Sequence, residues 1–391
     1  MSDIVIVGAK RTAIGSMLGQ FTGVPATTLG ATAIRAALEQ AGLDAAKVEE
    51  VYMGCVLPAG LGQAPARQAA IGAGVPTSAT CVTVSKVCGS GMQAIMFAHD
   101  SLRVGNATFA VAGGMESMTN APHLVTGSRS GIRFGDGQLV DHMAWDGLTN
   151  PYDGKAMGVF GEQCVAKYSM TREEQDAFAT ASVERALAAQ REGHVKHEIA
   201  PVTVKGRKGD TVIDTDEEPA RCDLGKVASL RPAFKSDGTI TAATSSKISD
   251  GAAALVLTTS EAAAAAGLKP IARIVGHMGH AHEPEWFTTA PVHAVKRLLD
   301  KLSWTVDDVD LFEINEAFAC VAMAPMRELG VPHDKLNVYG GATALGHPIG
   351  ASGARIVVTL LNALRQKGGK RGIASLCIGG GEATALALEL V

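Results

Sequence analysis

Hydrophobic positions along the chain repeat one order of elements twice. In residues 37–54, ALEQAGLDAAKVEEVYMG, apolar residues fall at the spacing of one helix face and are followed by a short turn and a strand-like run. Residues 298–315, LLDKLSWTVDDVDLFEIN, show the same helix, turn and strand in the same order. The pattern predicts two copies of one α/β unit within the chain.

Each copy continues with a glycine-rich turn that opens a helical pattern. The turns are CGSGMQAI at 88–95 and GASGARIV at 350–357, and each helix leads to a strand that ends in glycines, FAVAGG at 109–114 and IASLCIGGG at 373–381. Units of strand, turn and helix resemble one another in many proteins, so chance similarity is the alternative to a duplication. The matching order of helix, strand, glycine turn, helix and strand favours the duplication.

The sequence between the two copies follows neither pattern. It contains an irregular, glycine-rich stretch at 130–154 and then a long helical pattern that begins at Thr171 and Glu174, spaced as a capping box, and ends at Gly193. We therefore predict an inserted loop domain that covers a site at the carboxyl ends of the strands. The predicted parts are an N-terminal half at 1–117, completed by part of 250–270, the loop domain at 118–249 and a C-terminal half at 250–391.

Length and composition agree with a folded protein of more than one domain. The chain has 391 residues, beyond the roughly 250–300 at which one hydrophobic core stops growing, and 47% of its residues are hydrophobic and 19% charged. The formal net charge is −4 and no block of basic residues occurs, so nucleic acid is not an expected partner. No apolar run reaches the roughly 18 residues of a membrane helix, so we expect no membrane association.

The N-terminus and the cysteines indicate a compartment. The chain enters an apolar, strand-like run directly, without a signal or transit segment. Its seven cysteines include no C-x-x-C pair, which argues against a disulfide framework or a zinc site. These features predict a cytoplasmic protein without a resident metal.

Cys88 directly precedes the first glycine turn, after the strand-like CVTVSKV at 81–87. A cysteine at the start of a helix lies at the positive end of the helix dipole and near unpaired N–H groups, which lowers a thiol pKa from about 8.5 to roughly 3.5–7.5. This position would suit a reactive thiolate, but taken alone it favours a packed, inert cysteine beside a tight turn.

The same turn also fits a second class of function. Gly89-x-Gly91-x-x-Ala94, with Glu116 about 20 residues further on, matches the dinucleotide-binding fingerprint of an oxidoreductase. The turn does not follow the first strand of the chain, however, and a cysteine opens it. A dinucleotide-dependent oxidoreductase is therefore an alternative hypothesis.

The second copy carries a histidine before its glycine turn and a cysteine in its last glycine-ended strand. If the halves are pseudo-symmetric, two helix N-termini converge and His347 faces Cys88 as the base of an activated nucleophile. Cys377 precedes glycines, so the N–H of Gly379 could donate to an oxyanion. A hydrogen-bonded loop histidine and a core cysteine are the structural alternatives.

Asn315 and Glu316 end an apolar strand pattern and open a helical one. Asn315 could give polar support to the same site. The structural alternative is that both cap the helix, with Asn315 as the N-cap residue.

Four motifs stand together in this sequence: CGS at 88–90, NEAFA at 315–319, GHPIGASGAR at 346–355 and CIGGG at 377–381. They resemble the motifs of the thiolase family, and within it those of the acetyl-CoA C-acetyltransferases. Other stretches that are similar to the family are RTAIG at 11–15, GGMESM at 113–118, EEQDAFA at 173–179, VKGRKGD at 204–210, LRPAF at 230–234 and SDGAAALVL at 249–257. The resemblance covers essentially the whole chain.

The resemblance implies a fold of two βαβαβαββ halves in a five-layer α-β-α-β-α sandwich with an inserted loop domain. It implies that Cys88 is the nucleophile that holds the acyl group as a thioester, that His347 activates it, and that Cys377 is a second acid and base. His347 and a water held by Asn315 would form one oxyanion hole, and the backbone N–H groups of Cys88 and Gly379 the other.

The implied reaction is the reversible condensation of two acetyl-CoA to acetoacetyl-CoA and coenzyme A by a ping-pong mechanism. Coenzyme A and acetyl-CoA would be substrates, and no cofactor would be permanently bound. The residues that match the family's coenzyme A contacts are Leu148, Met157, Arg221, Phe234, Ser246, Ala317 and Phe318. The stretch PHLVTGSRSGIRFGDG at 122–137 resembles the loop through which family members form tetramers, so we predict a homotetramer, with a dimer as the alternative.

Three departures from the family pattern leave the substrate open. Ala156 occupies the place of a usual histidine, Tyr339 that of a usual asparagine, and the stretch TAATSSKISDG at 241–251 differs from the usual form. A degradative 3-ketoacyl-CoA thiolase that acts on longer acyl chains is therefore an alternative. A catalytically silent acyl-CoA carrier is another, but it would not require Cys88, His347 and Cys377 together.

Overall fold

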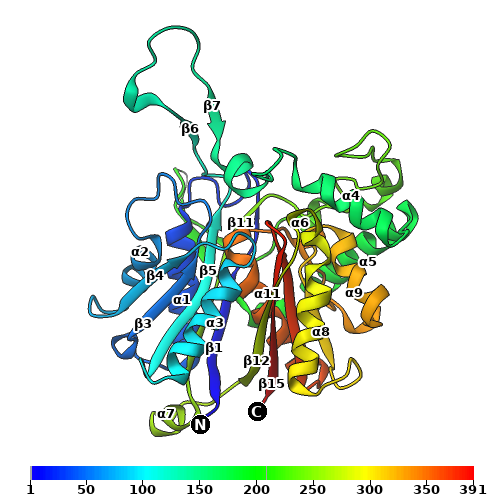
Figure 1. Ribbon diagram of the computed structural model, residues 1–391. Coiled ribbons are helices and arrows are strands. Elements are labelled where there is room, and N and C mark those ends of the chain that lie inside the picture. The colour runs from blue at the N-terminus through cyan, green and yellow to red at the C-terminus, as the bar shows by residue number, and fades with distance from the viewer. Residues whose placement is uncertain (1, 208) are drawn as a thin grey trace.

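The computed structural model describes residues 2–207 and 209–391. Its main sheet follows the strand order β13-β14-β15-β12-β1-β11-β5-β3-β4 (Figure 1). At the junction of β1 with β12, the register pairs only Val5 with Arg273 and Ile6 with Ala272, so two sets of strands meet there. The strand bounds are Ile4–Thr12 (β1), Glu50–Gly54 (β3), Thr80–Val84 (β4), Phe109–Ser117 (β5), Ser249–Thr259 (β11), Ala272–Ala281 (β12), Leu311–Ile314 (β13), Arg371–Ile378 (β14) and Glu382–Leu390 (β15).

The two sets of strands have the same internal order. Outward from the junction, one set runs β1, β11, β5, β3, β4 and the other runs β12, β15, β14, β13. In both sets the inner strands pair antiparallel, whereas β3 with β5 and β13 with β14 pair parallel. The counterpart of β4 is a single parallel bridge between Phe312 and Leu336. The predicted duplication is confirmed.

Helices cover both sets and fill the space between them. Helices α1 and α2 pack on one face of the N-terminal set, and α8 packs on the C-terminal set with α9 beside it. Helices α3 and α11 pack on each other between the sets (Figure 1). This is the expected five-layer sandwich. The helix bounds are Ala26–Ala41 (α1), Pro65–Gly72 (α2), Ser90–Arg103 (α3), Ala290–Leu302 (α8), Ala319–Leu329 (α9) and Ile349–Lys367 (α11).

The two central helices cross at a pair of glycines. A Cβ added at Gly91 on α3 would lie 2.8 Å from the backbone nitrogen of Ala354, and one added at Gly353 on α11 would lie 2.4 Å from that of Met92. These are the two glycines that the sequence repeat matches. Their role is therefore the close approach of two helix backbones.

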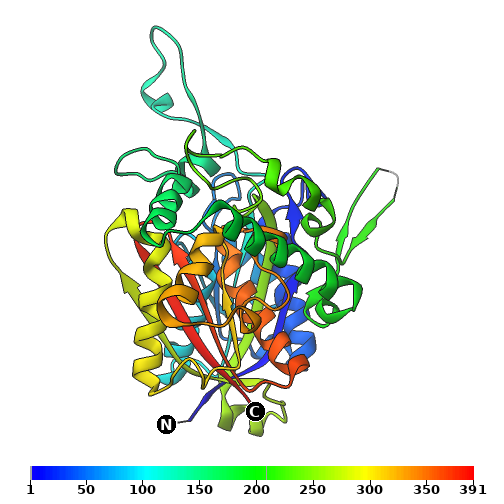
Figure 2. The ribbon, with the colours of Figure 1, turned by 90° about the vertical axis from the view of Figure 1, so that its right-hand side faces the viewer.

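Residues between β5 and β11 form the predicted insertion. Helix α5 begins with the predicted capping box, because Thr171 Oγ1 accepts from the N–H of Glu174 at 3.1 Å and the carboxylate of Glu174 accepts from the N–H of Thr171 at 2.9 Å. The hairpin of β6 and β7 extends away from the body of the molecule (Figures 1 and 2). The elements here are β6 (His123–Val125), β7 (Leu139–Asp141), α4 (Met157–Lys167), α5 (Arg172–Arg191), β8 (Ile199–Ala200), β9 (Val202–Val204), β10 (Thr211–Ile213) and α6 (Glu218–Arg221).

The insertion is attached to the N-terminal set by a buried ion cluster. Arg11 on β1 pairs with Glu198 at 2.6 Å and with Asp216 at 2.7 Å, and all three side chains are almost fully buried. Strand β11, which follows the insertion, lies between β1 and β5. Smaller elements outside the insertion include β2 (Gly15–Ser16), α7 (Ser260–Ala265), the 3-10 helix η6 (Pro284–Thr289) and α10 (Ala342–Leu345). No helix among the described residues is long and apolar enough to cross a membrane.

Candidate active site

Cys88 lies in the tight turn between β4 and α3. Val87 before it has a left-handed backbone with φ of 46°, which is strained for a branched residue. The hydroxyl of Ser90 holds the turn, since it accepts from the N–H of Lys86 at 2.8 Å and donates to the carbonyl of Val87 at 2.7 Å. A Cβ at Gly89 would lie 2.3 Å from the side chain of Ile378, so this glycine lets the turn contact the end of β14.

The predicted lowering of the Cys88 pKa is wrong. Burial of the thiol raises its pKa to about 11, and the charge of Glu116 acts in the same direction. The nearby backbone N–H groups of Gly379 and of Cys88 itself lower the pKa, but burial outweighs their effect. The thiol is therefore neutral at pH 7 and needs a base to become a nucleophile.

Cys377 and Gly379 lie at the end of β14, directly beside Cys88. The Cys377 side chain is fully buried, and burial followed by the charge of a Cys88 thiolate raises its pKa well above the ordinary value. The contact of Gly89 with Ile378, and that of Gly379 with Val87, bring together three of the predicted site residues, Cys88, Cys377 and Gly379.

His347 lies in the loop before α11 and is 5% exposed. Its Nδ1 is 2.6 Å from Ser352 Oγ, which itself donates to the carbonyl of Pro348 at 2.9 Å. Because the hydroxyl proton is used there, Nδ1 carries the imidazole proton and donates to Ser352, so Nε2 is the unprotonated nitrogen. Burial, followed by the charge of Arg355, lowers the pKa of His347 to about 3.

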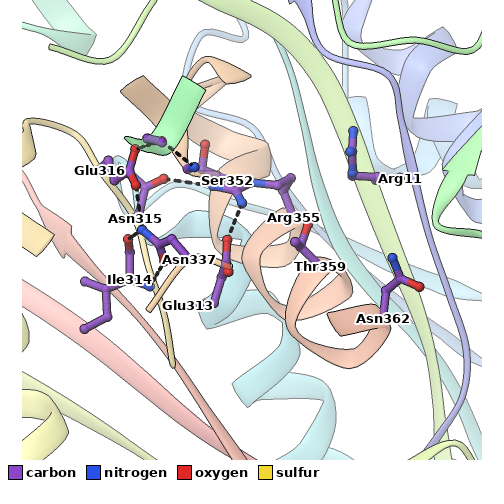
Figure 3. Close-up of polar contacts among 12 residues, drawn as sticks. Arg11, Glu313, Ile314, Asn315, Glu316, Asn337, Ser352, Arg355, Thr359 and Asn362 are labelled. Atoms are coloured by element: carbon purple, nitrogen blue, oxygen red, sulfur yellow. Dashed lines mark hydrogen bonds and ion pairs between the residues drawn. The ribbon is translucent and has the colours of Figure 1, made fainter. Parts of the chain in front are cut away.

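Asn315 does not cap a helix, so that structural alternative is wrong. Helix α9 begins at Ala319 with Phe318 as its N-cap, four residues beyond the end of β13. The Asn315 amide is fully buried, and its Nδ2 lies 3.4 Å from His347 Nε2. Its Oδ1 accepts from Arg355 at 3.3 Å, and Arg355 also pairs with Glu313 at 2.8 Å (Figure 3). These contacts orient the amide so that its N–H points at the imidazole.

Glu316 also does more than end a strand. Its carboxylate accepts from Ser182 on α5 at 2.8 Å, from the hydroxyl of Thr343 at 2.5 Å and from Asn337 at 2.8 Å. The buried carboxylate therefore connects the insertion to helix α10, which ends two residues before His347. Part of this network is visible in Figure 3.

Glu116 excludes the dinucleotide interpretation of the first turn. The carboxylate is fully buried and accepts from the backbone N–H groups of Val56 at 3.0 Å, Leu57 at 3.1 Å and Gly350 at 2.9 Å. It therefore holds protein backbone, including the start of α11, instead of a ribose. Burial raises its pKa to about 7. Gly91, the second glycine of the fingerprint, is already explained by the helix crossing.

Six of the seven residues that were expected to contact coenzyme A are linked by successive contacts, here called the row: Leu148, Met157, Phe234, Phe318, Ala317 and Ser246. Leu148 and Cys88 pack against the same buried apolar cluster, which includes Ile349. The Met157 N–H donates to the carbonyl of Leu148 at 3.2 Å, and the Met157 side chain lies beside Gly379.

The row continues over α4 to the second half. Phe234 packs against Gly158 and meets Phe318 edge to face, with ring centroids 5.7 Å apart. The Ser246 N–H donates to the carbonyl of Ala317 at 3.0 Å.

Arg221 lies in a different place from this row. It lines a pocket of about 230 Å³ together with Lys226, Lys247 and Leu230, and its guanidinium pairs with Glu217 at 3.1 Å. The pocket is nevertheless connected to the site, because the N–H of His347 donates to the carbonyl of Lys247 at 3.0 Å.

Sequence reasoning missed Ser352 and Arg355, which position the site. It also missed that the Glu116 carboxylate binds backbone N–H groups inside the protein. Arg355 and Glu116 act through contacts between residues far apart in the chain, whereas Ser352 contacts His347, five residues before it. A partial signal existed for Ser352, which lies on the helix that follows His347 in the motif GHPIGASGAR.

Comparisons with known proteins cover the whole chain. The model of the thiolase N-terminal domain matches residues 4–261, and the model of the thiolase C-terminal domain matches residues 268–390. Acetyl-CoA acetyltransferase 2 of Arabidopsis thaliana is 50% identical over 100% of this chain and 97% of its own length. An acetyl-CoA acetyltransferase of Chromobacterium violaceum is 50% identical over 99% of both chains.

Two solved structures have the same fold. The acetyl-CoA acetyltransferase of Bacillus anthracis superposes with a TM-score of 0.97 at 39% identity, covering 100% of this chain and 99% of the other. A thiolase of Ascaris suum in complex with coenzyme A gives a TM-score of 0.94 at 42% identity and covers 100% of both chains.

Proposed function

Because the chain belongs to the thiolase family, we propose that it is an acetyl-CoA C-acetyltransferase, an acyltransferase enzyme that condenses two acetyl-CoA to acetoacetyl-CoA and coenzyme A, reversibly. The observation that supports this most directly is the position of Cys88, in the turn whose Gly89 packs against Ile378, the residue between Cys377 and Gly379. Coenzyme A and acetyl-CoA are the substrates, and no cofactor is permanently bound.

In the first half-reaction, His347 Nε2 takes the proton of the Cys88 thiol as the sulfur attacks the thioester carbonyl of acetyl-CoA. The backbone N–H groups of Cys88 and Gly379 donate to the oxyanion that forms. The carbon–sulfur bond to coenzyme A then breaks, and the neutral thiol of Cys377 protonates the departing thiolate. Cys88 is left as an acetyl-thioester, beside an imidazolium and a Cys377 thiolate.

In the second half-reaction, the Cys377 thiolate takes the α-proton of the second acetyl-CoA. The imidazolium of His347 and a water held by Asn315 stabilise the enolate oxygen. The enolate carbon attacks the thioester, and the Cys88 sulfur leaves and recovers its proton from His347. All three groups return to their neutral forms, which agrees with a raised pKa at both thiols and a lowered pKa at the imidazole. The kinetics are ping-pong.

The assembly is a homotetramer, with a dimer as the alternative. The supporting observation is the row of exposed apolar side chains on the β6–β7 hairpin, where Phe134 is 102% exposed, Leu139 70% and Ile132 57%. Such side chains on a projecting hairpin fit burial against another copy. A cytoplasmic location agrees with seven free cysteines in the described chain.

A degradative thiolase that prefers longer 3-ketoacyl chains is the second candidate. Ala156 is exposed and directly precedes Met157, whose side chain lies beside Gly379. A small residue here leaves more room next to the acyl site than the usual histidine would.

The deciding experiment is coenzyme A-dependent cleavage of acetoacetyl-CoA, measured beside a longer 3-ketoacyl-CoA. We expect cleavage of acetoacetyl-CoA, and a loss of at least about 10³-fold in Cys88→Ala, because the covalent intermediate cannot form. Cys81→Ala is the matched control, since Cys81 lies on β4 just before the same turn and should retain full activity. Preference for the longer substrate would select the degradative reading, and no cleavage by folded protein would overturn both.

A further inference from the structure

Three histidines meet on the C-terminal half, outside the site described above. His280 is on β12, His282 follows that strand, and His293 is on the first turns of α8. One nitrogen of each ring lies within 4.8 Å of those of the other two. The ring centroids are 4.7 Å apart for His280 and His293, 5.0 Å for His280 and His282, and 5.5 Å for His282 and His293.

We propose that His280, His282 and His293 bind a divalent transition-metal ion of the Zn²⁺ class. Three imidazoles, one on a strand, one just after that strand and one on a helix, are the nitrogen ligands that Zn²⁺ prefers, with a fourth position open to water. In a tetrahedral site, nitrogens about 2.0–2.1 Å from the metal lie about 3.4 Å from one another. The ligand nitrogens lie within 4.8 Å of one another, so binding requires the rings to approach by up to about 1.4 Å.

The surroundings of the three rings favour ligation. Among the residues that the structure describes, none gives a hydrogen bond to the buried Nε2 of His280. His282 Nε2 donates to the carbonyl of Trp286 at 2.7 Å, which fixes its tautomer and leaves Nδ1 with a free lone pair. A backbone carbonyl that receives the second ring N–H is the usual support of a metal-binding histidine.

The protonation state agrees with this geometry. Burial, followed by the neighbouring imidazoles, lowers the pKa of His280, and burial followed by His282 lowers that of His293. Neutral imidazoles are the form that binds metal. Glu328 adds a negative charge near His293, whereas Lys167 there and Arg297 near His280 oppose the binding of a cation.

A second cluster of metal-ligand residues makes a useful comparison. His99, Asp100 and His277 also bring three donor atoms together. These three potential ligand atoms already bind one another, however, because Asp100 Oδ1 lies within hydrogen-bond distance of His99 Nδ1, at 2.9 Å, and of His277 Nε2, at 2.9 Å. We therefore assign the metal to the three-histidine cluster only.

The test is Zn²⁺ binding by the full chain, measured by competition with a chromophoric chelator after metal removal and without free coenzyme A. Cys88→Ser is used as the background, since thiols also bind Zn²⁺. We expect one Zn²⁺ per chain, and an affinity at least about tenfold lower in His280→Asn and in His293→Asn. His277→Asn, in the second cluster, is the matched control and should bind as tightly as the background.

Co²⁺ provides a measurement that needs no histidine substitution. The expected spectrum of the Co²⁺-loaded chain has the strong visible bands of a tetrahedral site without a thiolate charge-transfer band. Absence of Zn²⁺ binding, equal binding by both triad variants, or a loss confined to His277→Asn would each overturn the proposal. A thiolate-type Co²⁺ spectrum in the Cys88→Ser background would overturn it as well.

Discussion

At the scale of single residues, burial decides the proton affinities of the site. The thiols of Cys88 and Cys377 hold their protons more tightly than free cysteine, and His347 holds its proton less tightly than free histidine. In each case burial disfavours the charged form. The resting site is therefore a set of neutral groups, and charge appears only while a substrate is being converted.

The buried imidazole makes the fold sensitive to acid. The pKa of His347 is about 3 in the folded protein against 6.5 for a free side chain. Its folded pKa is depressed, so the unfolded chain binds more protons between these values, and this contribution to stability is lost as pH falls through that window. The loss approaches about 5 kcal/mol at the lower end.

His347→Asn should therefore flatten the dependence of stability on pH. The measurement is the free energy of unfolding in urea at several pH values between about 4 and 7. His123→Asn, at an exposed position on β6, is the control and should give the same slope of unfolding free energy against pH as the parent protein. Parallel slopes for the parent and His347→Asn would contradict the assignment.

The candidate nucleophile and base could be identified from the sequence, but their protonation could not. The glycine turns and the neighbouring Cys88 and His347 are local patterns. The covering that buries them comes from distant segments, including α11 and the insertion, so a local rule about helix dipoles gave the wrong direction for Cys88. Ser352 and Arg355 escaped notice because serine and arginine are common in helices, and only the fold places them at His347 and Asn315.

At the scale of elements, the site depends on how closely α3 and α11 approach. Cys88 lies just before α3 and His347 just before α11, so the helix crossing positions these two residues relative to each other. The order of elements in each half was predictable from hydrophobic periodicity. The reduction of the β4 counterpart to a bridge at Leu336 was not, because that strand is replaced by loop contacts that leave no periodic pattern.

Gly91→Ala and Gly353→Ala should each destabilise the protein by at least about 2 kcal/mol and lower thiolysis, because the added methyl meets backbone that cannot yield. Urea unfolding and steady-state kinetics measure both effects. Gly72→Ala, at the end of α2, is the control, since its Cβ would meet no backbone and only the methyl group of Ala31 on α1, at 3.2 Å. An effect of Gly72→Ala as large as that of the central glycines would argue against a special role of the crossing.

At the scale of the whole molecule, the β6–β7 hairpin is a test of the assembly. Phe134→Ser should convert tetramers to dimers, because it removes a large apolar side chain from the projecting tip. Sedimentation velocity measures the change. Val104→Ser is the control, as Val104 is 73% exposed at the end of α3. A tetramer that persists in Phe134→Ser, or a parent protein that is already dimeric, would rule out the hairpin as the contact.

The position of β11 in the sheet has a consequence for synthesis in the cell. This strand lies between β1 and β5, yet β5 ends at Ser117 and β11 ends at Thr259. At about 5–20 residues per second, a ribosome needs roughly 7–28 s to add the segment between these two ends. For that time the nascent chain has two strands with unpaired edges and no partner to join them, and such edges are prone to pair with other chains. The yield of active enzyme should therefore depend strongly on chaperones that bind the nascent chain at the ribosome. This dependence should be stronger than the stability of the folded protein would suggest.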